Sequence, residues 1–206
     1  MVGFQDLKEQ HMTYYFNGAK ILAPLSVTSN EPVYDVETIS LSKQRASQGA
    51  QRWELAFNTA TSGATEADML VGVATGLATA DTMVMPQLPS VDRLNTIGAS
   101  RAITVNAAAG VSSVTINSDG VLSKGSFVKF SNHAKIYMVT ADVAAGVVAV
   151  PIYPQLRTAV TTAHTFKTGS SATLTYYRDV SNLRGLTFTD GILSSTGTVN
   201  LVEAIV

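Results

Sequence analysis

Three histidines are the side chains of this sequence best suited to metal binding or proton transfer near neutral pH. His11 lies close to the N-terminus, His133 lies in a predicted turn between two strands, and His164 lies in a predicted loop. None of them has a histidine or carboxylate neighbour at the spacing of known zinc sites. We therefore expect no metal centre and no cofactor.

The carboxylates form only local pairs along the sequence. Asp35 and Glu37 fall on one face of a predicted strand, and Glu66 and Asp68 open a predicted helix. A solvated strand face and a helix cap explain these pairs better than acid–base catalysis does. The phosphate-binding pattern Gly-x-x-x-x-Gly-Lys and the nucleophile elbow Gly-x-Ser-x-Gly do not occur, and there is no cysteine. We expect no catalytic residues and a protein that is not an enzyme.

Charge is sparse in this chain of 206 residues. Only 14% of the residues are charged and the net charge is −1, whereas about 25% are charged in ordinary soluble domains. A net charge this close to zero gives no indication of a basic surface that would bind nucleic acid. Either the surface is rich in hydroxyl groups or other subunits cover much of it. We favour self-association, because permanent interfaces resemble a domain core cut in half.

The N-terminus lacks the pattern of a secretory signal, since Asp6, Lys8 and Glu9 stand where an apolar segment is required. The most apolar stretches, 69–84 and 139–153, are shorter than the ~20 apolar residues of a membrane-spanning helix. We expect no membrane insertion. The absence of cysteine fits a reducing compartment, or a particle assembled in one.

Residues 1–32 are predicted to form an N-terminal arm that contains an Asn-Gly turn and ends at Pro32. The arm either packs on its own domain or reaches a neighbour, and the sequence leaves both open. Its aromatic residues Tyr14, Tyr15 and Phe16 are candidates for contact with a partner.

Alternating side chains predict two strands after the arm. Apolar and polar residues alternate over 33–41 in the manner of a half-buried strand. The alternation is strict over 52–57, where Trp53, Leu55 and Phe57 share one face. We expect these three side chains to lie in the core.

One helix is predicted to start at residue 65. Thr65 and Asp68 form a capping box, and apolar side chains then recur at helical spacing. Leu70, Val73 and Leu77 belong to this stripe, and we predict that they pack in the core against a sheet.

A segment rich in Pro, Asn, Gly and Ser, at 86–100, marks a predicted domain boundary. Short strands at spacings of about 8–12 residues follow it and describe a small barrel or sandwich. These strands are expected at 102–106, 113–117, 126–130, 135–140 and 147–153. Pro151 and Pro154 predict that the last of them lies at an edge. Strands expected beyond residue 165 are predicted to return to the first domain.

Three parts of the sequence together resemble phage distal tail proteins. The first is a Ser/Gly-rich turn that leads into an Arg-Trp-Glu strand at 47–55. The second is a barrel hairpin at 124–143, followed by a Tyr-Pro-x-Leu-Arg element at 153–157. The third is Asp-Gly-Ile at 190–192, leading to Leu-Val-Glu-Ala-Ile at 201–205. The resemblance extends over most of the chain beyond the arm.

For the fold, these observations and the resemblance together predict a mainly β protein. A β-sandwich ring domain with one helix would be formed by residues 33–98 and 168–206, and it would carry an inserted small OB-like β-barrel at 99–167. On this interpretation the barrel loops contact partners, which makes His133 and Arg157 further candidate contact residues.

For the function, the resemblance implies a structural virion protein that forms a ring, commonly a hexamer, at the distal end of the tail. The ring would join the tail tube to the baseplate or tail tip and provide attachment for fibre or wedge proteins. The partners would be copies of the chain itself and other tail and baseplate proteins, assembled in the host cytoplasm and located in the virion. Two alternatives stay open: another virion role, such as tail tube, head completion or decoration, and a carbohydrate- or receptor-binding β module.

Overall fold

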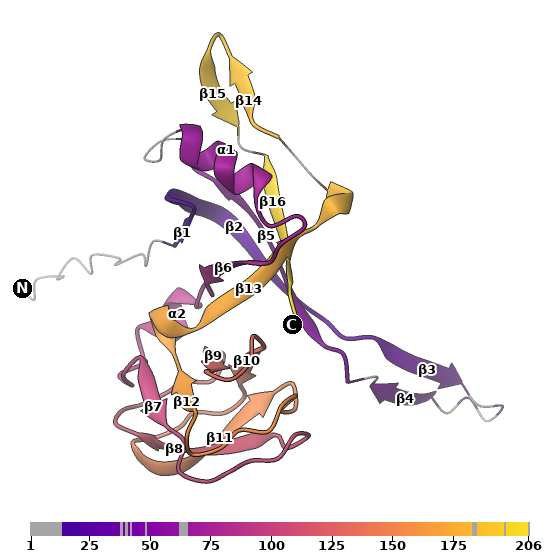
Figure 1. The fold of residues 1–206 in the computed structure, drawn as a ribbon. Coiled ribbons are helices and arrows are strands. Elements are labelled where there is room, and N and C mark those ends of the chain that lie inside the picture. The colour runs from indigo at the N-terminus through magenta and orange to yellow at the C-terminus, as the bar shows by residue number, and fades with distance from the viewer. Residues whose placement is uncertain are drawn as a thin grey trace, which may run out of the picture.

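The computed structural model describes residues 14–37, 39, 41, 43–47, 49–61, 66–182, 185–195 and 197–205. The described part of the chain is mainly β, as predicted, with 49% of the structure in strands and 9% in helices. The described strands form two six-stranded antiparallel sheets and two separate hairpins (Figure 1).

The first sheet combines strands from both ends of the chain, in the order β1-β2-β5-β16-β13-β6. These strands are β1 (Tyr15–Phe16), β2 (Ala19–Asn30), β5 (Arg52–Thr59), β16 (Thr198–Glu203), β13 (Thr173–Arg178) and β6 (Asp81–Val84). Asn17 and Gly18 join β1 to β2, with φ angles of 46° and 76° that suit an Asn-Gly hairpin turn. Residues 15–30 of the predicted arm therefore pack on the sheet of their own chain, and residues 1–13 lie outside the described residues.

β5 carries the centre of the first sheet's core. Its side chains alternate in burial, and Trp53, Leu55 and Phe57 are only 4%, 2% and 1% exposed. They belong to one apolar cluster with Phe127 and Ile136 of the second sheet. The two sheets therefore share an apolar core.

The second sheet is built only from residues between 100 and 167, in the order β7-β12-β9-β10-β11-β8. Its strands are β7 (Ser100–Ala102), β8 (Ser113–Ser118), β9 (Phe127–Phe130), β10 (Ile136–Val139), β11 (Gly146–Tyr153) and β12 (Thr165–Lys167). A bridge between Ile103 and Ile116 ties the chain just beyond β7 to β8, so that the two edges approach each other. The sheet thus curls into a half-barrel.

β11 is not an edge strand, contrary to the prediction from Pro151 and Pro154, because it lies between β10 and β8. Pro151 faces Ser113, the first residue of β8, and its carbonyl accepts a hydrogen bond from the backbone N–H of Thr140. The missing N–H of proline is tolerated there because it points to the same side as this carbonyl, toward Thr140, and the pairing with β10 ends at Val139 and Ile152, just before this position.

Two hairpins extend away from the first sheet (Figure 1). They are β3 (Val33–Glu37) with β4 (Lys43–Ser47), and β14 (Thr187–Thr189) with β15 (Ile192–Ser195). Every residue of β3 is exposed. The prediction of a half-buried strand over 33–41 is therefore wrong, since β3 ends at Glu37 and pairs with β4 alone.

The helices are short. They are α1 (Glu66–Ala74), α2 (Pro89–Asp92) and the 3-10 turns η1 (Gly169–Ser171) and η2 (Val180–Asn182). The helix predicted to start at residue 65 is α1, which lies beside the first sheet (Figure 1). The side chain of Val73, one of the predicted core residues in this helix, lies outside the described residues.

The leucines of the predicted helix do not form the core contact. Leu70 is 58% exposed, and Leu77, which follows the end of α1, is 37% exposed, so both core predictions are wrong. Gly72 is buried instead, and a Cβ at this position would lie 2.3 Å from Nδ2 of Asn17 in the β1–β2 turn. Glycine permits this close approach because it has no Cβ. The face of α1 that carries Gly72 therefore packs on the sheet, and the face that carries Leu70 is exposed.

Candidate functional site

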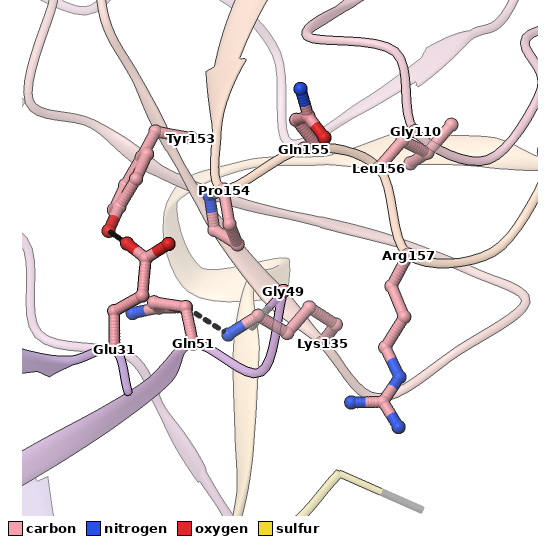
Figure 2. Close-up of a pocket in the computed structure, with 10 residues that line it drawn as sticks. All are labelled: Glu31, Gly49, Gln51, Gly110, Lys135, Tyr153, Pro154, Gln155, Leu156 and Arg157. Atoms are coloured by element: carbon pink, nitrogen blue, oxygen red, sulfur yellow. Dashed lines mark hydrogen bonds between the residues drawn. The ribbon is translucent and has the colours of Figure 1, made fainter. Parts of the chain in front are cut away.

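A cavity of about 530 Å³ lies where the β3–β4 hairpin leaves the first sheet and meets the half-barrel (Figure 2). Its lining comes from the β2–β3, β4–β5 and β7–β8 connections, from the residue before β10, and from the last residue of β11 with the chain that follows it. The lining residues are Glu31, Gly49, Gln51, Gly110, Lys135, Tyr153, Pro154, Gln155, Leu156 and Arg157. The cavity thus collects polar groups from both sheets.

A buried ion pair adjoins this site through Lys135, which lines the cavity. Lys135 Nζ lies 2.5 Å from Oε2 of Glu203, and the two side chains are 2% and 0% exposed. Glu203 also accepts hydrogen bonds from the backbone N–H groups of Trp53, at 3.0 Å, and Ile136, at 2.7 Å. A carboxylate at the end of β16 therefore connects β5 of the first sheet with β10 of the half-barrel.

A carboxamide completes the buried group. Lys135 Nζ donates a second hydrogen bond, of 2.6 Å, to Oε1 of Gln51, and Figure 2 shows this contact inside the cavity. Gln51 is 2% exposed, and its Nε2 donates to Oγ of Ser29 at 2.9 Å. Burial lowers the pKa of Lys135, while the charge of Glu203 acts against this decrease. The amine is therefore easier to deprotonate than a lysine in water.

A tyrosine–glutamate pair forms another part of the wall. The hydroxyl of Tyr153 donates to Oε2 of Glu31 at 2.5 Å and lies 3.4 Å from Oγ of Ser29 (Figure 2). Burial, and then the hydrogen bond to Glu31, raise the pKa of Tyr153. This pair attaches the start of the β3–β4 hairpin to the half-barrel.

His133 belongs to a hydrogen-bond network that reaches the cavity at Arg157. Its Nδ1 is 2.9 Å from Oδ1 of Asn132 and its Nε2 is 2.8 Å from the hydroxyl of Tyr137, which also accepts the backbone N–H of Arg157 at 3.0 Å. Because Oδ1 of Asn132 can only accept, Nδ1 carries the proton and Nε2 accepts from Tyr137. Burial, followed by nearby positive charges, lowers the pKa of His133 to about 4. The imidazole is therefore neutral at physiological pH.

The depressed pKa of His133 predicts acid sensitivity. Between the ordinary pKa of 6.5 and the folded value of about 4, the unfolded chain binds this proton and the folded chain does not. The contribution of His133 to stability should thus be complete above pH 6.5 and fall as the pH decreases toward 4. Urea unfolding at several pH values should show a flatter pH dependence for His133→Gln over this interval. Parallel curves for the variant and the native chain would contradict this assignment.

The predicted contact residues divide into two groups. Tyr14 is half-buried, with a pKa that burial raises to about 12, and Tyr15 is 59% exposed. Phe16 is only 5% exposed and packs on the ring of Phe57 at 5.4 Å, so it is a core residue and not an exposed contact. These residues lie at the opposite end of β2 from the cavity, which has Glu31 in its wall.

The other two predicted contact residues lie close together. His133 is half-buried and both of its ring nitrogens are engaged within the chain, whereas Arg157 is exposed at the cavity. The backbone of Arg157 and the ring of His133 meet at the hydroxyl of Tyr137. The structure therefore joins these two residues to each other and to the cavity, and it leaves only Arg157 as an accessible charge.

Sequence reasoning missed the central residues of the site. Gln51, Lys135 and Glu203 are separated by 84 and 68 residues along the chain. A signal was present, because Lys135 directly precedes an apolar strand and Glu203 interrupts the apolar run at 201–205. A charge inside a predicted buried strand implies a buried partner, but the sequence does not identify that partner.

Comparison with models of known protein families gives no match, and comparison with curated proteins gives none either. The site must be interpreted from its own chemistry. Among the described residues, no group of three or more His, Cys, Asp or Glu side chains is placed to hold a metal ion. Neither α-helix in the described part of the chain has the length and apolar character needed to cross a bilayer.

Proposed function

We propose that the protein is a structural subunit that assembles head to tail with copies of itself into a ring at the distal end of a phage tail. In this proposal the ring joins the tail tube to the baseplate or tip and offers attachment to other tail proteins. The chain acts by forming contacts and not by catalysis. The resemblance of the Arg-Trp-Glu strand and the barrel segment to distal tail proteins motivates the location.

The exposed apolar face of the β3–β4 hairpin carries the proposal. The register places Tyr34 opposite Ala46 and Val36 opposite Gln44 on one face, whereas Asp35 and Arg45 pair at 3.1 Å on the other. Tyr34 and Val36 are 64% and 58% exposed. An isolated two-stranded hairpin is at best marginally stable in water. The β3–β4 hairpin therefore requires a neighbouring subunit that covers its apolar face.

A second exposed apolar surface lies at the other end of the long strands. β2 leads into the hairpin, whereas the opposite end of the β2–β5 pair lies near α1 and β14–β15 (Figure 1). Leu70 and Val71 of α1 are 58% and 57% exposed, and Phe188 and Ile192 of β14–β15 are 49% and 72% exposed. Two different apolar surfaces at opposite ends suit a head-to-tail contact, which closes into a ring at the right rotation per subunit.

The arrangement of the sheets supports the finer architecture within this proposal. The half-barrel strands, all between residues 100 and 167, lie between β6 and β13 in the sequence. We assign residues 33–98 and 168–206 to the ring domain of β-sandwich type, and residues 99–167 to an inserted OB-like barrel. Residues 1–32 then supply one edge of the ring domain through β1 and β2.

Charging the apolar face of the hairpin should disrupt assembly. Each of Tyr34 and Val36 would contribute roughly 1.5–3 kcal/mol when buried by a neighbour, so a Tyr34→Asp/Val36→Asp variant should associate at least about tenfold more weakly. Native mass spectrometry and light scattering should show rings of the native chain and monomers of the variant. Val147→Asp, at a 69% exposed position on the half-barrel, provides the matched control and should assemble normally.

Negative-stain microscopy of the same samples distinguishes the possible assemblies. Closed six-fold rings support the proposal, and binding of the rings to purified tails at one end supports the location. Stacked tubes favour a tail-tube role. A native chain that stays monomeric at high concentration, or a double variant that assembles as well as Val147→Asp, contradicts the head-to-tail model.

A further inference from the structure

Three reactive groups meet at the cavity, two of them in its lining and the third hydrogen-bonded to Lys135, and the proposed assembly does not use them. The ammonium of Lys135, the carboxamide of Gln51 and the carboxylate of Glu203 are each at least nine-tenths buried. They come from the residue before β10, from the residue before β5, and from the end of β16. Lys135 Nζ lies 2.6 Å from Oε1 of Gln51 and 2.5 Å from Oε2 of Glu203. An amine, an acyl group and a proton acceptor are thus in contact.

We propose that Lys135 and Gln51 form an intramolecular isopeptide bond, with Glu203 as the group that carries the proton. The modification would join the β4–β5 connection to the half-barrel through side chains that are 84 residues apart in sequence. It requires no cofactor and no oxidant. It is independent of the assembly proposed above.

The reaction begins with proton transfer. Glu203 takes one proton from the Lys135 ammonium, which leaves a neutral amine with a free electron pair beside the Gln51 carboxamide. A general base must lie within hydrogen-bond distance of the proton that it removes, and Glu203 meets this condition. Desolvation supports the step, because burial of a lysine amine favours its neutral, nucleophilic form.

The bond then forms by acyl transfer. The electron pair of Lys135 Nζ attacks Cδ of Gln51, the bond from Cδ to Nε2 breaks, and Nε2 leaves with its two hydrogens. Of the three protons on the original ammonium, one stays on the new amide nitrogen and two pass to the leaving nitrogen, one of them by way of Glu203. Ammonium is released, Glu203 is again ionised, and charge is conserved.

The surroundings hold the reacting groups in place. The ring of Trp53 lies against the amine, with Nζ 6.0 Å from its centroid, and Trp53 itself is 4% exposed. Fixed groups in such a site react as one molecule, so the entropy of bringing them together is already lost on folding. The cavity of about 530 Å³ that Gln51 lines has room for the released ammonia.

The mass of the purified full chain tests the proposal. We expect a mass that is lower than that of the unmodified sequence by one molecule of ammonia. Trypsin should then release a single branched species that joins 46–52 to 130–157, because an amidated Lys135 is no longer a cleavage site. Fragment ions should place the branch at Gln51. Recovery of 46–52, 130–135 and 136–157 as separate peptides from aged native protein would overturn the proposal.

Two variants and one control identify the groups involved. Lys135→Arg and Glu203→Gln should each restore the full mass and give separate peptides. Lys129→Arg, which changes a lysine that donates to the carbonyl of Thr173, should still lose ammonia. A succinimide at Asn17-Gly18 also loses ammonia but yields no branched peptide, so ammonia loss without branching counts against the proposal. The peptide map of the native chain decides the question even if a variant does not fold.

Discussion

A Glu203→Ala variant is expected to lose about 3–5 kcal/mol of its free energy of unfolding at neutral pH, the range for removal of one partner from a buried ion pair. The variant leaves the Lys135 ammonium, 2% exposed, without its carboxylate. It also leaves the backbone N–H groups of Trp53 and Ile136 without their acceptor.

Urea unfolding monitored by fluorescence of the single tryptophan measures this effect. Glu54→Ala is the matched control, because Glu54 lies on β5 opposite Val202 and pairs with Arg52 at 3.0 Å in a far more exposed position. A surface pair of this kind contributes less than about 1 kcal/mol. Equal losses of unfolding free energy in the two variants would show that burial does not determine how much Glu203 contributes to stability.

The second large effect is expected at Trp53, where alanine should remove about 3–5 kcal/mol, as for other large buried aromatic residues. The indole packs edge-on against Phe127 at 5.2 Å and against Tyr153 at 6.4 Å, and its Nε1 donates to the carbonyl of Ile136 at 3.0 Å. All three neighbours belong to the half-barrel. Trp53→Ala therefore weakens the contact between the sheets as well as the core of the first sheet.

Circular dichroism must be used to follow this variant, because the fluorescent side chain is removed. Tyr15→Ala is the control: the side chain is aromatic but 59% exposed, and its change should stay within about 0.5 kcal/mol. A Trp53→Ala variant as stable as Tyr15→Ala would mean that the half-barrel is held mainly by other contacts.

The parts of the fold that follow a strict period were predictable from the sequence. β5 was visible from its alternation, and the half-barrel strands were visible because turns separate short apolar runs. β8, for example, spans Ser113–Ser118 where 113–117 was predicted. In these segments the local pattern and the tertiary burial agree. The apolar face of each strand is the face that is buried, as the alternation of apolar and polar residues indicates.

The failures occur where tertiary contacts override the local pattern. The apolar residues of α1 suggested a core face, yet Gly72 makes the close contact and Leu70 is left exposed. β3 alternates like a half-buried strand, yet it lies in a hairpin outside the sheets. The sequence shows that a residue is apolar but not whether its own chain or another covers it.

The candidate site was the least predictable part. Gln51, Lys135 and Glu203 lie in three segments that only the completed fold brings together. Each residue alone has a simpler interpretation as a polar residue beside a strand. Arg157 lies in the segment that follows β11, and its link to His133 through Tyr137 depends on the way the chain leaves that strand.

The position of the half-barrel in the chain has a consequence for the order of folding. β6 and β13 are hydrogen-bonded neighbours, and the backbone N–H of Met85 donates to the carbonyl of Ala172. Everything between these two residues acts as the loop of one very long hairpin. Closing such a loop in a disordered chain carries an entropy cost that increases with its length. A half-barrel that forms first brings β6 and β13 together. The first sheet can then form by pairing these two strands next to the half-barrel and adding the others.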